Sequence, residues 1–333
     1  MTYNYLILIK MNKIKVGIVG GAGYTGGELL RMLVNHPNVD IVFVNSNSNA
    51  GNPVYAVHTD LFGDTELQFT DTLSQDIEVL FLCVGHGAAR KFLEANPIDE
   101  SIHIIDLSQD YRLKAKAGDF VYGLPELQRD KIKTAKHVAN PGCFATAIQL
   151  GLLPLAAQGL LTSAIHINAT TGSTGAGQSL SPTSHFSWRN NNLSIYKAFE
   201  HQHLHEIGES LLQLQPTFDQ PINFVPQRGA FTRGILASAY IESALSLEEA
   251  YDVYNTYYKD HPFTHVSPPN IDLKQVVNTN KALIHLEKHG DKLMIISIID
   301  NLLKGASGQA VQNMNLLFGL DETTGLRLKA TGF

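Results

Sequence analysis

Cysteine is scarce in this sequence, which contains only Cys83 and Cys143 among its 333 residues. Two cysteines cannot make a disulfide framework, and Cys83 lies inside an apolar run, so a reducing, cytoplasmic setting is expected. Long hydrophobic runs are also missing. The apolar stretch from Tyr5 to Ile9 is too short for a membrane span or a signal-peptide core, so we expect a soluble protein with no membrane partner.

Basic residues are outnumbered, with 25 Lys and Arg against 31 Asp and Glu, for a formal net charge of -6. No basic block occurs either, so no nucleic-acid partner is expected. The hydrophobic share of 44% and the length indicate a globular protein of two domains. The fold is expected to begin after Met11, with Met1 to Lys10 as a loose extension or an upstream start.

A βαβ pattern opens the chain. The β-branched run "IKVGIVG" from Ile14 predicts a buried parallel strand, and Leu29, Leu30 and Leu33 then recur at helical spacing. The run "VDIVFVNS" predicts the next strand. Strand, helix and strand patterns follow over 77–85, 87–97 and 101–108. This alternation predicts a doubly wound α/β domain that reaches to about Asn140.

The second half of the chain has a different pattern. Strand-like runs over 163–171, 233–243, 282–288 and 292–300 are separated by turns, which predicts a mixed or antiparallel sheet. The segment 305–320 predicts a helix that is free to pack on either domain.

Glycines follow the first strand. Gly20, Gly23 and Gly26 have the spacing G-x-x-G-x-x-G where the first helix opens, which favours a dinucleotide site over a ligand-free turn. The second strand ends in "NSNS" from Asn45, without the acidic residue that an NAD site uses to hold the ribose. Because a carboxylate would repel a 2′-phosphate, its lack favours NADP.

Cys143 lies between a Pro-Gly step and a predicted helix from Phe144 to Leu153, with Asn140 expected near the helix cap. A helix start stabilises a thiolate and lowers the thiol pKa, so this cysteine is predicted to be a nucleophile. The alternative is a small buried hydrophobic residue, which fits Cys83 better.

The segment "EHQHLHEI" supplies candidate proton partners for that thiol. His203 and Glu206 share a face if the segment is helical, so the carboxylate could orient the ring. A metal site is the rival interpretation, but no ligand set is complete at recognised spacing, and a polar surface role is preferred for His205. Arg228 and Arg233 are either anion clamps or surface salt-bridge residues.

Together these residues resemble the N-acetyl-γ-glutamyl-phosphate reductase family. The motifs that carry the resemblance are "GIVGGAGYTGGELL", "IDLSQDYRL", "YGLPEL", "NPGCFAT", "YKAFEHQHLHEI" and "KGASGQAVQNMN", within a match from about Lys15 to Leu326. The resemblance implies an α/β protein with a Rossmann NADP-binding domain at 13–142 plus 308–333. It further implies a mixed α+β catalytic and oligomerisation domain at 143–307, and a homodimer or homotetramer.

The activity implied is NADPH-dependent reduction of N-acetyl-γ-glutamyl phosphate to the semialdehyde and phosphate, in arginine biosynthesis. Cys143 would form a thioacyl enzyme and His203 would transfer the proton, although His201 stays open for that step. No metal is expected. It implies substrate-binding or supporting roles for His201, Glu206, Arg112, Arg233 and Gln309. It implies cofactor-binding roles for Gly20, Gly23, Tyr24, Thr25, Gly26, Ser46 and Asn301.

Four positions depart from the family pattern. Gln202 and His205 replace a basic residue and a proline, Gln178 stands where an arginine is usual, and Asn47 replaces an arginine after Ser46. These positions concern the substrate and cofactor pockets. An N-succinyl substrate, an aspartyl or aminoadipyl phosphate, and a catalytically silent NADP-binding module therefore stay open as alternatives.

Overall fold

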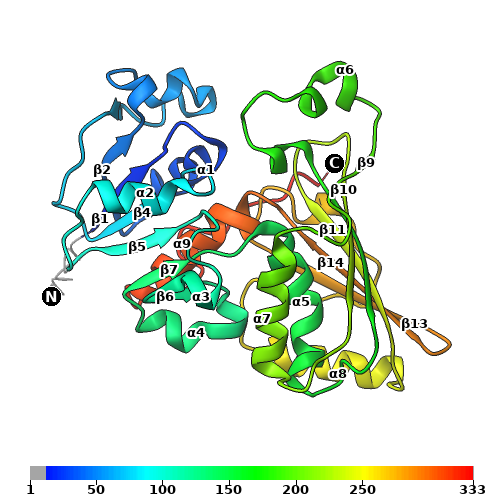
Figure 1. Ribbon diagram of the computed structural model, residues 1–333. Coiled ribbons are helices and arrows are strands. Elements are labelled where there is room, and N and C mark those ends of the chain that lie inside the picture. Colours follow the sequence, from blue (N-terminus) through cyan, green and yellow to red (C-terminus); the bar gives the residue numbers. More distant parts are fainter. Residues whose placement is uncertain (1–12, 333) are drawn as a thin grey trace, which may run out of the picture.

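The computed structural model describes residues 13–332, so the extension expected at residues 1–10 and the terminal residue 333 lie outside the described part. Two seven-stranded sheets lie side by side, one built from the first half of the chain and one from the second (Figure 1). No helix within residues 13–332 is both long and apolar enough to cross a membrane.

The first sheet is wholly parallel, with strand order β3-β2-β1-β4-β5-β7-β6. Its strands are β1 (Ile14–Val19), β2 (Val39–Asn45), β3 (Phe69–Thr70), β4 (Val79–Leu82), β5 (His103–Asp106), β6 (Phe120–Tyr122) and β7 (His137–Ala139). The central strands β1 and β4 are buried almost throughout, because helices cover both faces of a parallel sheet. The doubly wound α/β prediction is confirmed.

Five helices accompany this sheet: α1 (Tyr24–Leu33), α2 (Ala88–Ala95), α3 (Lys114–Ala117), α4 (Pro125–Lys133) and α9 (Gly308–Leu317). Helix α9 comes from the far end of the chain and packs beside α1, α4 and β5 (Figure 1). Val311 and Met314 of α9 join Ile18 and Leu29 in one hydrophobic core. The helix expected at 305–320 therefore returns to the first sheet, while the exact domain boundaries stay a prediction.

The second sheet is mixed, with strand order β12-β13-β14-β11-β8-β10-β9. Its strands are β8 (Ile165–Thr171), β9 (Ser194–Ile195), β10 (Ile222–Arg228), β11 (Ile235–Glu242), β12 (Thr264–Val266), β13 (Ala282–His289) and β14 (Lys292–Ile299). Only the β8–β10 and β12–β13 pairs are parallel. The mixed sheet expected from the sequence is confirmed, although β9, β10 and β12 gave no clear sequence signal.

Helices α5 (Cys143–Ala157), α7 (His203–Leu214) and α8 (Leu247–Tyr258) lie along one face of the second sheet (Figure 1). Helix α5 is buried on nearly all sides, because it packs against α7, α8 and the strands β11, β13 and β14. The short helix α6 (Phe186–Arg189) lies in a long connection between β8 and β9. Short helical turns occupy Asn47–Asn49, Val54–Ala56, Thr59–Leu61, Ser173–Ala176, Pro182–Ser184 and Leu273–Gln275, and a π-helical turn, η7, spans Leu303–Ser307.

A fully buried ion pair joins the two halves of the molecule. Lys304 of η7 lies 2.8 Å from Glu126 of α4, and both side chains are wholly inaccessible to solvent. The ammonium also donates to Gln312 of α9 at 3.0 Å, and Thr264 of β12 donates to Glu126 at 2.8 Å. Burial alone would raise the pKa of Glu126, but the positive charges of Lys304 and His261 have the larger combined effect. The net pKa shift is therefore downward from 4.5.

We expect Lys304→Met to lower the free energy of unfolding by about 3–5 kcal/mol, because it leaves the Glu126 charge buried without a partner. Removing both charges in Lys304→Met/Glu126→Leu is expected to restore most of that loss. Urea unfolding followed by circular dichroism measures both. The exposed pair between Lys133 and Asp130 offers the control Lys133→Met, which is expected to change little. A Lys304→Met loss no larger than the control would contradict the prediction.

Candidate active site

Cys143 is the first residue of α5, which makes the helix begin one residue earlier than the sequence indicates. Gly142 is the N-cap and offers no side chain, so the cap expected from Asn140 is wrong. The Asn140 amide instead donates to the carbonyl of Ala306 at 2.9 Å and accepts from Asn313 at 3.1 Å. The first N–H groups of α5 are therefore left without a side-chain acceptor, at the helix end that favours negative charge.

Glu206 holds the Pro-Gly turn that precedes the thiol. One carboxylate oxygen accepts from the Gly142 N–H at 2.9 Å and from the Tyr122 hydroxyl at 2.9 Å, and the other pairs with Arg112 at 3.1 Å. Arg112 also donates to the carbonyl of Asn140 at 2.8 Å, on the other side of the same turn. This buried network fixes the backbone immediately before Cys143.

His203 begins α7 with its ring pressed against the same turn. A Cβ atom on Gly142 would lie 2.3 Å from Nε2 of His203, so glycine is required for the imidazole to come this close. Glu206 shares the helix face with His203, as expected, but its nearest oxygen is 3.9 Å from Nε2, beyond hydrogen-bonding distance. The carboxylate therefore positions the turn more directly than it orients the ring.

The other two histidines of the segment differ in their surroundings. The His201 ring lies 4.6 Å from that of His203, and its Nδ1 accepts from the His203 backbone N–H at 3.2 Å. His205 is exposed on the opposite side of α7, as the surface interpretation predicts. Within residues 13–332, no cluster of three or more His, Cys, Asp or Glu side chains is arranged to hold a metal ion.

Burial keeps both inner histidines neutral. It lowers the pKa of His203 well below 6.5, with further lowering from the nearby charge of Arg112. It also lowers the pKa of His201 to about 4, with Lys197 as the next largest cause. At neutral pH each ring is therefore unprotonated and able to accept a proton.

The thiol pKa differs from the sequence expectation. Burial raises the pKa of Cys143 above 9.0, and the opposing effects of Arg112 and the Phe144 N–H are smaller. The expected lowering is thus wrong, because desolvation of the thiolate outweighs the helix-start position. Cys83 is buried in the hydrophobic core that contains Ile18, and burial raises its pKa to about 12, which fits a structural cysteine.

The glycine loop after β1 has the geometry of an anion-binding turn. Gly20 adopts φ of +78°, and a Cβ there would lie 2.5 Å from the carbonyl of Cys83, so only glycine fits. Gly23 caps α1 without a side-chain hydrogen bond, and Tyr24 and Thr25 open the helix. With Gly26 inside its first turn, the N-terminus of α1 therefore presents free N–H groups toward a phosphate.

The end of β2 fits the adenosine side of such a ligand. Ser46 is buried directly after the strand, and its hydroxyl accepts from Asn49 at 3.1 Å. Residues 41–59 contain no Asp, Glu, Lys or Arg. The described residues therefore fit a nicotinamide dinucleotide, with hydroxyl and amide groups near the expected ribose position.

Two other predicted residues make hydrogen bonds within the protein. Asn301 accepts from the Gly234 N–H at 2.7 Å and donates to Thr174 at 3.0 Å, which ties together two loops beside the site. Gln309 of α9 is fully buried and donates to Thr146 of α5 at 3.3 Å, while its amide oxygen has no partner.

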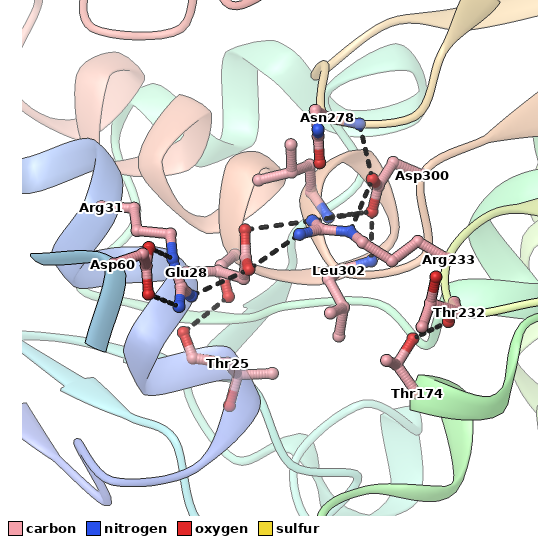
Figure 2. A network of polar contacts seen from close by, with 12 residues as sticks. Thr25, Glu28, Arg31, Asp60, Thr174, Thr232, Arg233, Asn278, Asp300 and Leu302 are labelled. Carbon is pink, nitrogen blue, oxygen red and sulfur yellow. Dashed lines mark hydrogen bonds and ion pairs between the residues drawn. The ribbon is translucent and has the colours of Figure 1, made fainter. Parts of the chain in front are cut away.

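Arg233 bridges the two halves of the protein (Figure 2). Its guanidinium donates to both carboxylate oxygens of Glu28 on α1, at 2.9 and 3.0 Å, and to those of Asp300 after β14, at 3.0 and 3.2 Å. Arg31 extends the network by pairing with Glu28 and Asp60. Arg233 therefore links the glycine-loop helix to the second sheet, which is a supporting role.

Tyr122 is a site residue that sequence reasoning did not single out. Its hydroxyl accepts from Gln149 at 2.8 Å while it donates to Glu206. The residue stands in "YGLPEL", one of the motifs quoted above, but a lone tyrosine at the end of a short strand gives no spacing signal.

Alkylation of Cys143 is expected to keep accelerating as the pH rises past 9, because burial raises the thiol pKa and the thiolate is the reacting form. Iodoacetamide labelling followed by peptide mass spectrometry at successive pH values measures the rate. Cys83 in the same sample is the internal control and is expected to label far more slowly. A plateau below pH 8 would show a stabilised thiolate and overturn the assignment.

The comparisons with known proteins agree with this geometry. Residues 15–135 match the family described as "Semialdehyde dehydrogenase, NAD binding domain", and residues 143–301 match "Semialdehyde dehydrogenase, dimerisation domain". Solved structures similar to this chain include aspartate semialdehyde dehydrogenase II from Vibrio cholerae, with a TM-score of 0.73 and 15% identity over 92% of this chain and 99% of that one. The aspartate semialdehyde dehydrogenase of Candida albicans gives a TM-score of 0.69 with 14% identity, over 92% of this chain and 98% of that one. At such identities these structures show the fold alone.

Curated relatives are much more similar in sequence. The N-acetyl-gamma-glutamyl-phosphate reductase of Bacteroides thetaiotaomicron is 62% identical over 96% of this chain and 100% of its own length. The enzyme of the same name from Christiangramia forsetii is 56% identical over the same shares of the two chains. The chain therefore belongs to the N-acetyl-gamma-glutamyl-phosphate reductase family, within the semialdehyde dehydrogenase fold.

Proposed function

We propose that this protein reduces N-acetyl-γ-glutamyl phosphate to N-acetylglutamate semialdehyde and phosphate with NADPH, as a step of arginine biosynthesis. The observation that carries the proposal is the placement of Cys143 at the start of α5 with the neutral imidazole of His203 against the preceding residue. Relatives that are up to 62% identical over nearly the whole chain are named N-acetyl-gamma-glutamyl-phosphate reductase, which supports N-acetyl as the acyl group.

In the first half-reaction the sulfur of Cys143 attacks the acyl carbon. A C–S bond forms, the C–O bond to phosphate breaks, and the product is a thioacyl enzyme. Because the thiol pKa is raised, the proton must leave the sulfur during the attack, and His203 accepts it. The uncapped N–H groups at the start of α5 favour the negative charge that develops beside the sulfur.

The same residues serve the second half-reaction. A nicotinamide cofactor held at the glycine loop would supply the hydride that brings the thioester carbon to the oxidation level of an aldehyde. The C–S bond then breaks, and His203 returns a proton to the departing sulfur. The turn at Gly142 is held through both steps by the network of Glu206, Tyr122 and Arg112. The thiol and the His203 ring therefore keep their relative positions.

Several residues are proposed to hold the cofactor. The pyrophosphate would bind at the N-terminus of α1, against the glycine loop of Gly20, Gly23 and Gly26 together with Tyr24 and Thr25. Ser46 would lie near the ribose. The residues proposed to hold the cofactor are Gly20, Gly23, Tyr24, Thr25, Gly26, Ser46 and Asn301. NADP is preferred over NAD in this proposal, because residues 41–59 contain no carboxylate to repel a 2′-phosphate.

We also propose a homodimer or homotetramer in the cytoplasm. The family description of residues 143–301 as a dimerisation domain supports an oligomer. A reducing compartment is proposed because the reaction needs Cys143 as a free thiol, and an oxidising one would consume it.

The assay that tests the function runs the reaction in reverse, as phosphate-dependent reduction of NADP by N-acetylglutamate semialdehyde. We expect turnover in the unmodified protein and a loss of at least about 1,000-fold in Cys143→Ser, because the alcohol is a far weaker nucleophile. Cys83→Ala is the matched control and is expected to keep its activity. Full activity of Cys143→Ser would exclude the thioacyl route.

The acyl group is tested in the same assay by comparing N-acetyl, N-succinyl and unacylated semialdehydes. A kcat/KM at least about tenfold higher for the N-acetyl compound is expected. NADP binding without turnover of any semialdehyde would instead identify a silent cofactor-binding module.

Ser46→Asp is expected to lower the kcat/KM ratio of NADP to NAD at least about tenfold, because a carboxylate repels a 2′-phosphate and accepts from ribose hydroxyls. Steady-state kinetics with both cofactors measures the ratio, and fluorescence titration with NADPH measures binding without turnover. Ser46→Ala removes the hydroxyl without adding charge and serves as the control. An unchanged ratio in Ser46→Asp would place the 2′-phosphate elsewhere.

A further inference from the structure

The two arginines expected to support substrate binding are already neutralised by carboxylates. Arg112 pairs with Glu206 at 3.1 Å, and Arg233 pairs with Glu28 at 2.9 Å and with Asp300 at 3.0 Å. The whole chain carries a net charge of -6, whereas an acyl phosphate is itself an anion. Binding it therefore requires a local positive charge that the protein does not already compensate.

Arg228, the last residue of β10, supplies such a charge. Its guanidinium lies over the ring of Tyr196, 4.6 Å from the ring centroid, and its Nε atom is buried without a hydrogen-bond partner. The ion pairs found among residues 13–332 include Arg112 and Arg233 but not Arg228. The guanidinium is thus stacked in place while its charge stays unpaired.

Two more cations lie on neighbouring segments: Arg189 contacts the Arg228 backbone, and Lys197 follows Tyr196 in the sequence. Neither has an ion pair with a carboxylate in the described part of the chain. Arg189 donates to the carbonyl of Arg228 at 2.6 Å and directs its other donors to further carbonyls and the Ser194 hydroxyl. Lys197 is exposed, and its ammonium donates to the amide oxygen of Gln202 at 3.3 Å. We call Arg228, Lys197 and Arg189 the cationic cluster.

A series of neighbouring rings connects this cluster to Gly142, the residue before Cys143. The Tyr196 ring lies 5.8 Å from that of His201, which lies 4.6 Å from that of His203, and His203 touches Gly142. The electrostatics agree, because Lys197 lowers the pKa of both histidines and the charge of Cys143 is one cause of the raised pKa of Tyr196. The cluster therefore borders the site where the thiol reacts.

The backbone that presents Lys197 is strained. Lys197 has φ of +47° and Phe199 has φ of +62°, a left-handed conformation that costs residues other than glycine free energy. Such strain persists where the surrounding structure enforces it, and it often occurs at ligand-binding segments. Here the strained residues lie in the segment between β9 and α7, just before His201 and His203.

We propose that Arg228 and Lys197 form the subsite that binds an anionic group of the substrate, either its phosphate or its carboxylate. Arg189 adds positive charge but has no donor to spare. The inference rests on the proposed function and adds to it the side chains that hold the substrate. A guanidinium suits this task, because its planar donors match the paired oxygens of a carboxylate or phosphate.

The test measures two Michaelis constants in the reverse assay, one for inorganic phosphate and one for the semialdehyde. Arg228→Met keeps an apolar stem on Tyr196 while removing the charge, and it is expected to raise one of the two constants about 10- to 100-fold, with kcat changed less than about threefold. Arg228→Lys is expected to recover part of the loss. Lys197→Met, at an exposed position that poses little folding risk, is expected to raise the same constant.

The constant that rises identifies the group bound: phosphate if the phosphate KM changes, carboxylate if the semialdehyde KM changes. Lys292→Met removes a charge at the far end of β14 and is the control, expected to change neither constant. Unchanged constants in both Arg228→Met and Lys197→Met would overturn the subsite, as would losses confined to kcat.

A second measurement does not need turnover, and so separates failure of the subsite from failure of the proposed function. Inorganic phosphate and N-acetylglutamate are tested as protectants of Cys143 against iodoacetamide, followed by mass spectrometry. At least one is expected to protect the unmodified protein, and about 10-fold more is expected to be needed in Arg228→Met. Protection that is equal in the two proteins, or absent in both, would overturn the subsite even if the reductase activity is present.

Discussion

Glu206 places one buried carboxylate where three donors from separate parts of the chain meet. The N–H of Gly142, the hydroxyl of Tyr122 and the guanidinium of Arg112 all converge on it. Without these contacts, the turn before the thiol would be held only through Asn140, and Gly142 would lose the hydrogen bond that fixes it beside the His203 ring. A buried carboxylate is tolerated here because its charge is matched by Arg112 and its oxygens are hydrogen-bonded.

Burial of the site also sets the protonation states of the Cys143 thiol and the His203 imidazole. Burial disfavours both a thiolate and an imidazolium, so Cys143 stays protonated and His203 stays neutral. The thiol and the imidazole therefore carry no charge in the resting site. In the proposed reaction, charge would develop only as the sulfur attacks, at the helix end that favours negative charge.

Much of the fold could be predicted from the sequence, because each βαβ step leaves a local pattern of apolar residues. The position of Cys143 at a helix start was also readable from Pro141 and Gly142. What could not be read depends on contacts between distant residues. Gly142 and Glu206 are 64 positions apart, and Glu28 and Arg233 are 205 apart, so no spacing rule reveals that these pairs meet.

The thiol pKa shows a second limit of sequence reasoning. The position at the start of α5 was correctly inferred, yet the direction of the pKa shift was not, because burial comes from packing against the second sheet and from the surrounding loops. Arg228 illustrates the same limit for a charged side chain. An arginine beside a turn gives no sign in the sequence of whether it will find a carboxylate partner, as Arg233 does, or none.

The return of α9 to the first sheet has a consequence for biosynthesis. Val311 and Met314 complete the core around Ile18, but they leave the ribosome only after every strand of the mixed sheet has been made. Part of the apolar surface of the parallel sheet therefore stays uncovered while the second half of the chain is translated. The packing around the glycine loop is therefore completed only late in synthesis, and a chain truncated before α9 would carry the glycine and cysteine motifs without that packing.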